Sequence, residues 1–134
     1  MLDLALNCNE GPINIKEIGI RQEISPKYLE HLIAPLRVAG LVKSIRGAHG
    51  GYILARPPEK IVLSEVIQVL EGSIAPSECV DDPSICSREK LCVTRDIWAE
   101  MKEAMEKVLE STTLKDLVDR KRLKERSKAA MYHI

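Results

Sequence analysis

The sequence has no phenylalanine, and aromatic residues make up only 3% of its 134 positions. A hydrophobic content of 45% still supplies a core, which leucine, isoleucine, valine and alanine must build. No segment approaches the roughly 18 apolar residues of a membrane-spanning helix. The first residues also lack the basic stretch and cleavage site of a secretion signal. These absences predict one compact domain in the cytoplasm, with no membrane partner.

Net charge is a second absence, because 20 basic and 20 acidic side chains cancel. The overall charge therefore gives no support for a nucleic-acid partner, although local clusters matter more than the sum. Catalytic patterns are missing as well. We find no nucleophile–base pair and no glycine-rich phosphate loop followed by a helix. The sequence therefore argues against an enzyme.

Helical patterns dominate what is present, so the expected fold class is mainly α. An apolar segment at residues 1–8 begins without a capping residue, as the end of a longer helix would. Asn14 and Glu17 have the spacing of a capping box at the start of a second helix. Ser25 suits the N-cap of a third helix, with Pro26 at its first position.

A glycine-rich turn, RGAHGG, then separates two short apolar segments, which predicts a β-hairpin over residues 41–54. Two helices followed by a hairpin are the arrangement of a winged helix-turn-helix. We expect the helix-turn-helix at about 15–38, the wing at about 41–54 and the DNA-binding domain at 1–72.

In such a fold the second helix of the pair enters the major groove of DNA, and its N-terminal residues reach the bases. Lys27 suits guanine or phosphate, Glu30 suits the amino group of cytosine, and an arginine beside a glycine suits the minor groove. The candidate DNA contacts are Lys27, Tyr28, Glu30, His31, Arg46, Gly47 and His49. An exposed charged helix face is also often only solvated, so the pattern alone leaves that alternative open.

The four cysteines form a group of three and a single residue. Cys79, Cys86 and Cys92 fall within an irregular segment at 73–92, whereas Cys8 ends an apolar segment and is expected in the core. Soft thiolates favour zinc or an iron–sulfur cluster. Because the C-x2-C pairs of zinc sites are absent, the spacing predicts a [2Fe–2S] or [4Fe–4S] cluster. Of these two types, we expect [2Fe–2S]. A redox thiol group or a simple zinc site is the alternative.

A cluster of this kind normally has four protein ligands, and the three cysteines leave one position open. Asp96, one turn into the following helix, is the first candidate, and Glu89 and Asp82 are weaker ones.

A long amphipathic helix is predicted from Val93 onward. Its apolar stripe comprises Val93, Ile97, Met101, Ala104 or Met105, and Val108. Thr113 and Asp116 have capping-box spacing before a short terminal helix within 93–122. The remaining residues, 123–134, are expected to form a charged tail that frays.

Two stretches of the chain, ISPKYLEHLIAPLRVAGLVKSIRGAHGGYILAR and LSEVIQVLEG, resemble the IscR-type family of winged-helix transcription regulators. The three cysteines downstream add to the resemblance, which covers nearly the whole chain. It implies a homodimer through an antiparallel pairing of residues 93–110, bound to a two-fold operator in double-stranded DNA. It also implies an iron–sulfur cluster whose state selects operators, often those of iron–sulfur assembly genes.

The chain departs from the family at three places. Family members usually have about a dozen residues, with a basic arm and in some cases a cluster ligand for the partner chain, before the position of Met1. The protein that gives the family its name has a histidine where this chain has Arg95, which cannot bind iron. Pro35 is unusual inside a recognition helix.

The function expected from the sequence is therefore a DNA-binding regulator that senses an iron–sulfur cluster. One alternative is a regulator of the same fold that responds to nitric oxide, an oxidant or a partner protein without a stable cluster. A second alternative, of another class, is an iron–sulfur carrier or scaffold.

Overall fold

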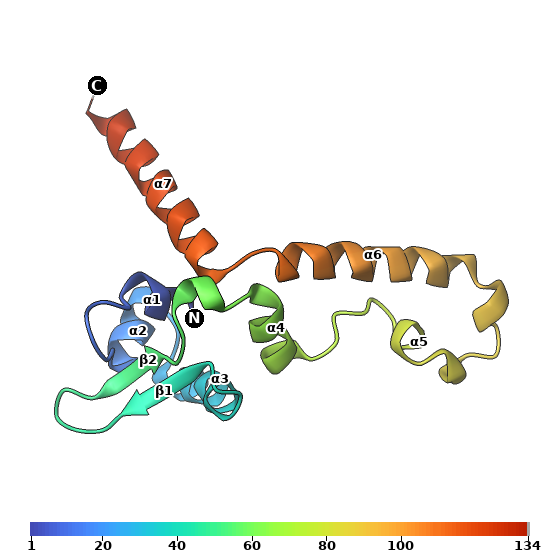
Figure 1. Ribbon diagram of the computed structural model, residues 1–134, viewed down its shortest axis with the longest axis horizontal. Helices are drawn as coiled ribbons and strands as arrows, with labels where there is room; N and C mark the ends of the chain where they lie inside the picture. Colours follow the sequence, from blue (N-terminus) through green and yellow to red (C-terminus); the bar gives the residue numbers. More distant parts are fainter. Residues whose placement is uncertain (134) are drawn as a thin grey trace.

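The computed structural model describes residues 1–133, and helices dominate it (Figure 1). In chain order the elements are α1 (Leu2–Leu6), α2 (Ile15–Gln22), α3 (Pro26–Val38), β1 (Val42–Ile45), β2 (Gly51–Leu54), η1 (Pro58–Lys60), α4 (Leu63–Glu71), α5 (Glu78–Asp81), η2 (Pro83–Ile85), η3 (Glu89–Leu91), α6 (Val93–Glu110) and α7 (Leu114–Tyr132). The first seven elements gather at one end, while α6 and α7 project from them in different directions. No helix in the described part of the chain is long and apolar enough to cross a membrane. The prediction of a mainly α fold with a small hairpin is confirmed.

The helix-turn-helix comprises α2, a three-residue turn and α3. The Ser25 side chain accepts the backbone N–H of Tyr28 at 3.2 Å, so the predicted cap of α3 is formed. Asn14 caps α2 by accepting from Lys16 at 2.8 Å, one residue before the position that a capping box would use. A Cβ atom on Gly19 would lie 2.7 Å from the carbonyl oxygen of Ile24. The turn therefore closes this tightly only because residue 19 has no side chain.

The hairpin pairs β1 with β2 in antiparallel register, with Val42 opposite Leu54 and Ile45 opposite Gly51. Backbone bonds of 3.0 and 2.8 Å join Ile13 to Tyr52 and fasten the segment before α2 to β2. A Cβ atom on Gly51 would lie 2.3 Å from the carbonyl oxygen of Ile13, which only glycine avoids. The wing is thus held against the start of the helix-turn-helix.

The core lies where α1, α3, β1, α4 and the start of α7 meet. Its most deeply buried side chains are Leu41, Ile61 and Leu114. Leu114 donates its backbone N–H to the carbonyl of Ile61, and Leu63 donates to that of Thr112, each at 2.9 Å. The connection into α4 therefore pairs with the connection between α6 and α7, which anchors both long helices to the winged domain.

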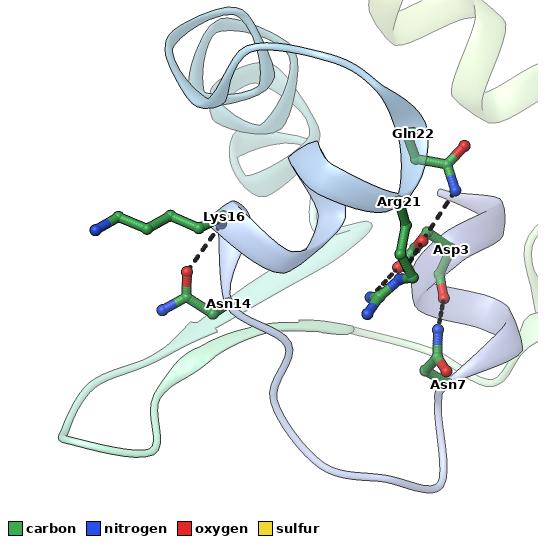
Figure 2. A network of polar contacts seen from close by, with 6 residues as sticks. All are labelled: Asp3, Asn7, Asn14, Lys16, Arg21 and Gln22. Carbon is green, nitrogen blue, oxygen red and sulfur yellow. Dashed lines mark hydrogen bonds and ion pairs between the residues drawn. The ribbon is translucent and has the colours of Figure 1, made fainter.

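One buried charge joins α1 to the end of α2 (Figure 2). The carboxylate of Asp3 is only 6% exposed, and it accepts two bonds from the Arg21 guanidinium at 2.9 and 2.6 Å. The side-chain amide of Gln22 donates a third bond at 3.0 Å. These bonds, led by those from Arg21, lower the pKa of Asp3 against the opposing effect of burial. The charge is tolerated inside because it is fully paired.

The terminal helix differs from the prediction of a short helix followed by a fraying tail. The capping box of Thr113 and Asp116 is formed as predicted, but α7 continues for 19 residues to Tyr132. The sequence of α7 is mostly charged and offers little apolar face, and for this reason a tail was expected. However, no glycine or proline interrupts residues 114–132, and i,i+4 ion pairs such as Lys115–Asp119 support the helix.

Replacing Asp3 with asparagine should destabilise the fold by about 1–3 kcal/mol, because Arg21 and Gln22 lose a charged acceptor. Urea unfolding at neutral pH measures this. Since the pKa of Asp3 is lowered in the folded chain, its contribution is complete above the ordinary pKa of aspartate. The contribution should disappear as the pH falls through the lowered value.

Asp119→Asn is the matched control, because that carboxylate belongs to an exposed i,i+4 pair worth less than about 0.5 kcal/mol. Equal effects of the two substitutions would contradict the role given to Asp3.

Candidate functional site

The helix α3 presents two different faces. Leu29, Ile33 and Leu36 are buried against the core, which fixes the rotation of the helix. The opposite face carries the predicted DNA contacts, and all four side chains are exposed: Lys27, Tyr28, Glu30 and His31. They occupy the first two turns of α3, the part that reaches base edges in helix-turn-helix proteins.

The predicted wing contacts lie in the turn between β1 and β2. Arg46, Gly47 and His49 are all exposed, and Gly47 has a φ of +124° that favours glycine. A hollow of about 340 Å³ separates this turn from the N-terminal end of α2 and includes Asn14 in its wall. Because α3 packs against β1, the wing and the exposed face of α3 belong to one packed unit.

Sequence reasoning missed two further basic residues near this unit, Lys16 and Lys43, both of which are exposed. Figure 2 shows the Lys16 side chain extending away from the N-terminal end of α2. The first helix of a helix-turn-helix crosses the DNA backbone, so a lysine at its N-terminal end is a candidate phosphate contact. The position of Lys16 two residues after the Asn14 cap, in the first turn of α2, is the signal that identifies it.

The three clustered cysteines lie within or directly after short helical turns. Cys79 is in α5, Cys86 follows η2, and Cys92 is the N-cap of α6. All three are half-buried free thiols, so the chemistry of the donors fits a group that prefers soft ligands. Within residues 1–133, however, no three Cys, His, Asp or Glu side chains are gathered as in a formed metal site.

Arg95 links two of these cysteines. Its backbone N–H donates to the Cys92 sulfur at 3.4 Å, and its Nε donates to the carbonyl oxygen of Cys79 at 3.0 Å. Asp96, the first candidate for a fourth ligand, is exposed in the first turn of α6 and is not gathered with the thiols. Its role stays a prediction, as do the weaker ones of Glu89 and Asp82.

The expectation for Cys8 was wrong, because this residue is exposed. The helix α1 ends at Leu6, so Cys8 lies in the turn that follows it. The buried positions of this first segment are instead Asp3, Leu4 and Ala5.

The long helix α6 also has two faces. One face, with Trp98, Lys102 and Leu109 half-buried, is turned toward the elements α4 and α5 that contact the helix. The other carries the predicted apolar stripe, whose exposed members are Val93, Ile97, Met101, Met105 and Val108. Soluble proteins rarely leave such a row of large apolar side chains exposed to water.

Comparison with known proteins supports the interpretation of the fold. Residues 1–120 match the family model described as Rrf2, iron-dependent transcriptional regulator. The chain is 47% identical over 118 residues to Protein rrf2 of Nitratidesulfovibrio vulgaris, covering 88% of this chain and 79% of the relative.

Two solved structures are similar as well. That of CymR, the global cysteine regulator of B. subtilis, matches with a TM-score of 0.74 at 44% identity, over 89% of this chain and 87% of that one. The structure of IscR of T. potens matches with a TM-score of 0.73 at 45% identity, over 89% and 77% of the two chains. Because the chain is equally similar in sequence to CymR and to IscR, these two matches do not distinguish the two types of regulator.

These matches cover most of the chain, and none is to an enzyme family. The winged helix-turn-helix that the structure shows is the DNA-binding unit expected of such a match. The chain therefore belongs to the Rrf2 family of transcription regulators.

Proposed function

We propose that this regulator binds a two-fold operator as a homodimer and senses an iron–sulfur cluster through Cys79, Cys86 and Cys92. The observation that carries the proposal is the arrangement of α6. This one helix starts at a cysteine, presents an apolar stripe to solvent and ends at the core of the winged domain. The proposed place of action is the cytoplasm, and the proposed targets include iron–sulfur assembly genes.

The DNA-reading part rests on the exposed N-terminal turns of α3 and on the wing. Lys27 and Arg46 bring positive charge, which phosphate and the narrow minor groove attract. Glu30 and His31 bring groups that bond to base edges. The N-terminal end of α3 itself favours a nearby phosphate through its free N–H groups.

Arg46→Ala should weaken binding to a duplex selected from random sequences by about tenfold, or about 1.4 kcal/mol. The loss follows from removing a guanidinium at the exposed tip of the wing, and fluorescence anisotropy at fixed salt measures it. Lys124→Ala is the control, because that exposed residue lies on α7, which projects away from the wing and α3 (Figure 1). Unchanged affinity for the Arg46 variant would contradict the assignment of the wing.

The homodimer rests on the apolar stripe of α6. Val93 is 76% exposed and Val108 is 63% exposed, at opposite ends of an 18-residue helix. At 1.5 Å per residue that helix is about 27 Å long, so two antiparallel copies would bury a continuous seam. Covering these side chains removes apolar surface from water, which favours association.

Ile97→Glu should convert the dimer into a monomer, because it places a charge within that seam. Analytical ultracentrifugation measures the mass directly. Leu123→Glu is the control, since Leu123 is an exposed leucine on α7 outside the stripe. A dimer that persists in the Ile97 variant would show that the stripe is not the interface.

The sensing part rests on the chemistry and placement of the three thiols. They are free, half-buried and confined to 14 consecutive residues, 79–92, next to the N-terminal end of α6. The chain would supply thiolates from Cys79, Cys86 and Cys92, with Asp96 proposed as a fourth ligand. When bound, a cluster of the proposed [2Fe–2S] type supplies sensitivity to iron supply and redox state. The segment must close around it, since no three ligands are gathered in the described chain.

Cys92→Ser should abolish the iron and the visible absorbance of anaerobically purified protein. Serine keeps an N-cap acceptor for α6 while removing the thiolate, so the fold is preserved. Cys8→Ser should leave the iron content unchanged, because Cys8 lies in the turn after α1. Wild-type protein that stays free of iron after reconstitution would refute the sensing part.

A second candidate function keeps the fold and the DNA binding without a stable cluster. Arg95 favours it, because its side chain bonds the Cys79 carbonyl and its backbone N–H bonds the Cys92 sulfur, so contacts within the chain already position both residues. Nitric oxide, an oxidant or a partner protein would then be the signal, and metal analysis separates this candidate from the first. Failure to bind any promoter fragment at low salt would instead favour an iron–sulfur carrier or scaffold.

A further inference from the structure

Two side chains on the inner face of α6 hold α5, the helix that contains Cys79. Arg95 and Lys102 are seven residues apart, so they lie on one face of the helix, about 10 Å apart along its axis. Arg95 donates from Nε to the Cys79 carbonyl oxygen at 3.0 Å, and Lys102 donates from Nζ to Asp81 at 2.8 Å. The short helix is thus fastened to the long one at two points.

The second of these points also reaches α4. Asp81 accepts a hydrogen bond from the hydroxyl of Ser73, which directly follows Gly72, the C-cap of α4. Lys102 pairs in addition with Glu106 at 3.4 Å. These polar side chains line a small cavity of about 240 Å³ between α4, α5 and α6. The C-terminal ends of α4 and α5 and the middle of α6 therefore share one group of polar contacts.

These contacts differ from the other ion pair on the same helix. Lys107 and Glu103 are one turn apart, and both are about 70% exposed. Such a pair joins the helix only to itself and contributes little. Lys102 is 25% exposed, and its partner Asp81 is 21 residues away in the chain. Unlike the Lys107–Glu103 pair, the contacts of Lys102 and Arg95 join α6 to the cysteine segment.

We propose that Arg95 and Lys102 form a latch that holds Cys79 beside the N-terminal end of α6, where Cys92 lies, and that links the cysteine segment to α4. Both are positioning residues, since neither is a metal ligand. The purpose of the latch rests on the proposed sensing function, because holding two thiols together shortens the search for a shared ligand. The latch itself consists of contacts between residues of the chain.

Thiol alkylation tests the latch without any metal. With Cys8, Cys86 and Cys92 replaced by serine, Cys79 is the single thiol, and its rate of reaction with iodoacetamide reports how often the segment opens. Lys102→Ala and Arg95→Ala should each raise that rate about two- to fivefold, the range expected for contacts of modest strength. Lys107→Ala is the matched control on the same helix and should leave the rate unchanged. Rates in both latch variants equal to that of the control would overturn the proposal.

A double-mutant cycle then tests the Asp81–Lys102 contact. If the two side chains act together, Asp81→Asn with Lys102→Ala should open the segment no more than either change alone. If the double variant instead raises the alkylation rate by the product of the two single effects, the two side chains act independently. The Asp81–Lys102 contact would then not be part of the latch.

Iron content separates this inference from the proposed function. If the chain with all four cysteines takes up no iron while alkylation of Cys79 still rises in both latch variants, the latch stands and the sensing function fails. If that chain takes up iron while alkylation follows the control, the sensing function stands and the latch is overturned.

Discussion

The buried carboxylate of Asp3 is the constraint on which the placement of the DNA-reading surface depends. Arg21 and Gln22, which donate to it, are the last residues of α2, immediately before the turn into α3. Because a buried carboxylate must keep these donors, the end of α2 is fixed against α1. The turn and the recognition helix start from that fixed point. The position of the end of α2 therefore sets their direction relative to the rest of the domain.

Close backbone contacts also fix the position of the wing relative to the helix-turn-helix. Gly19 lets the turn between α2 and α3 close, and Gly51 lets the hairpin approach the segment before α2. The paired connections at Ile61 and Leu114 then tie α4, α6 and α7 to the same core. A change in the cysteine segment at the far end of α6 is therefore connected to the winged domain through packed elements rather than through a flexible linker.

The sequence predicted those features whose cause is local. The start of α3 depends on Ser25 and Pro26, the start of α7 on Thr113 and Asp116, and the wing on its glycines, so pattern alone identified each. Features caused by distant partners were missed. Asp3 stands in an apolar segment and gives no sign that Arg21 will pair with it. The length of α7 was missed because a mostly charged helix without an apolar face resembles a tail.

The candidate site shows the same division. The exposed face of α3 follows from helical periodicity, whereas the contacts of Arg95 with Cys79 and Cys92 depend on how α5 folds back onto α6. The sequence identified Arg95 only as a residue that cannot bind iron. Only the folded structure shows that Arg95 bonds to both cysteines.

The central claim is that one chain reads DNA and responds to a cluster. Its most direct test is the affinity of one anaerobic preparation for its selected duplex, measured at fixed salt before and after iron is removed. We expect the dissociation constant to change by at least about fivefold, the lower range of coupling between two sites. Equal affinities for the iron-loaded and iron-free forms would contradict the account.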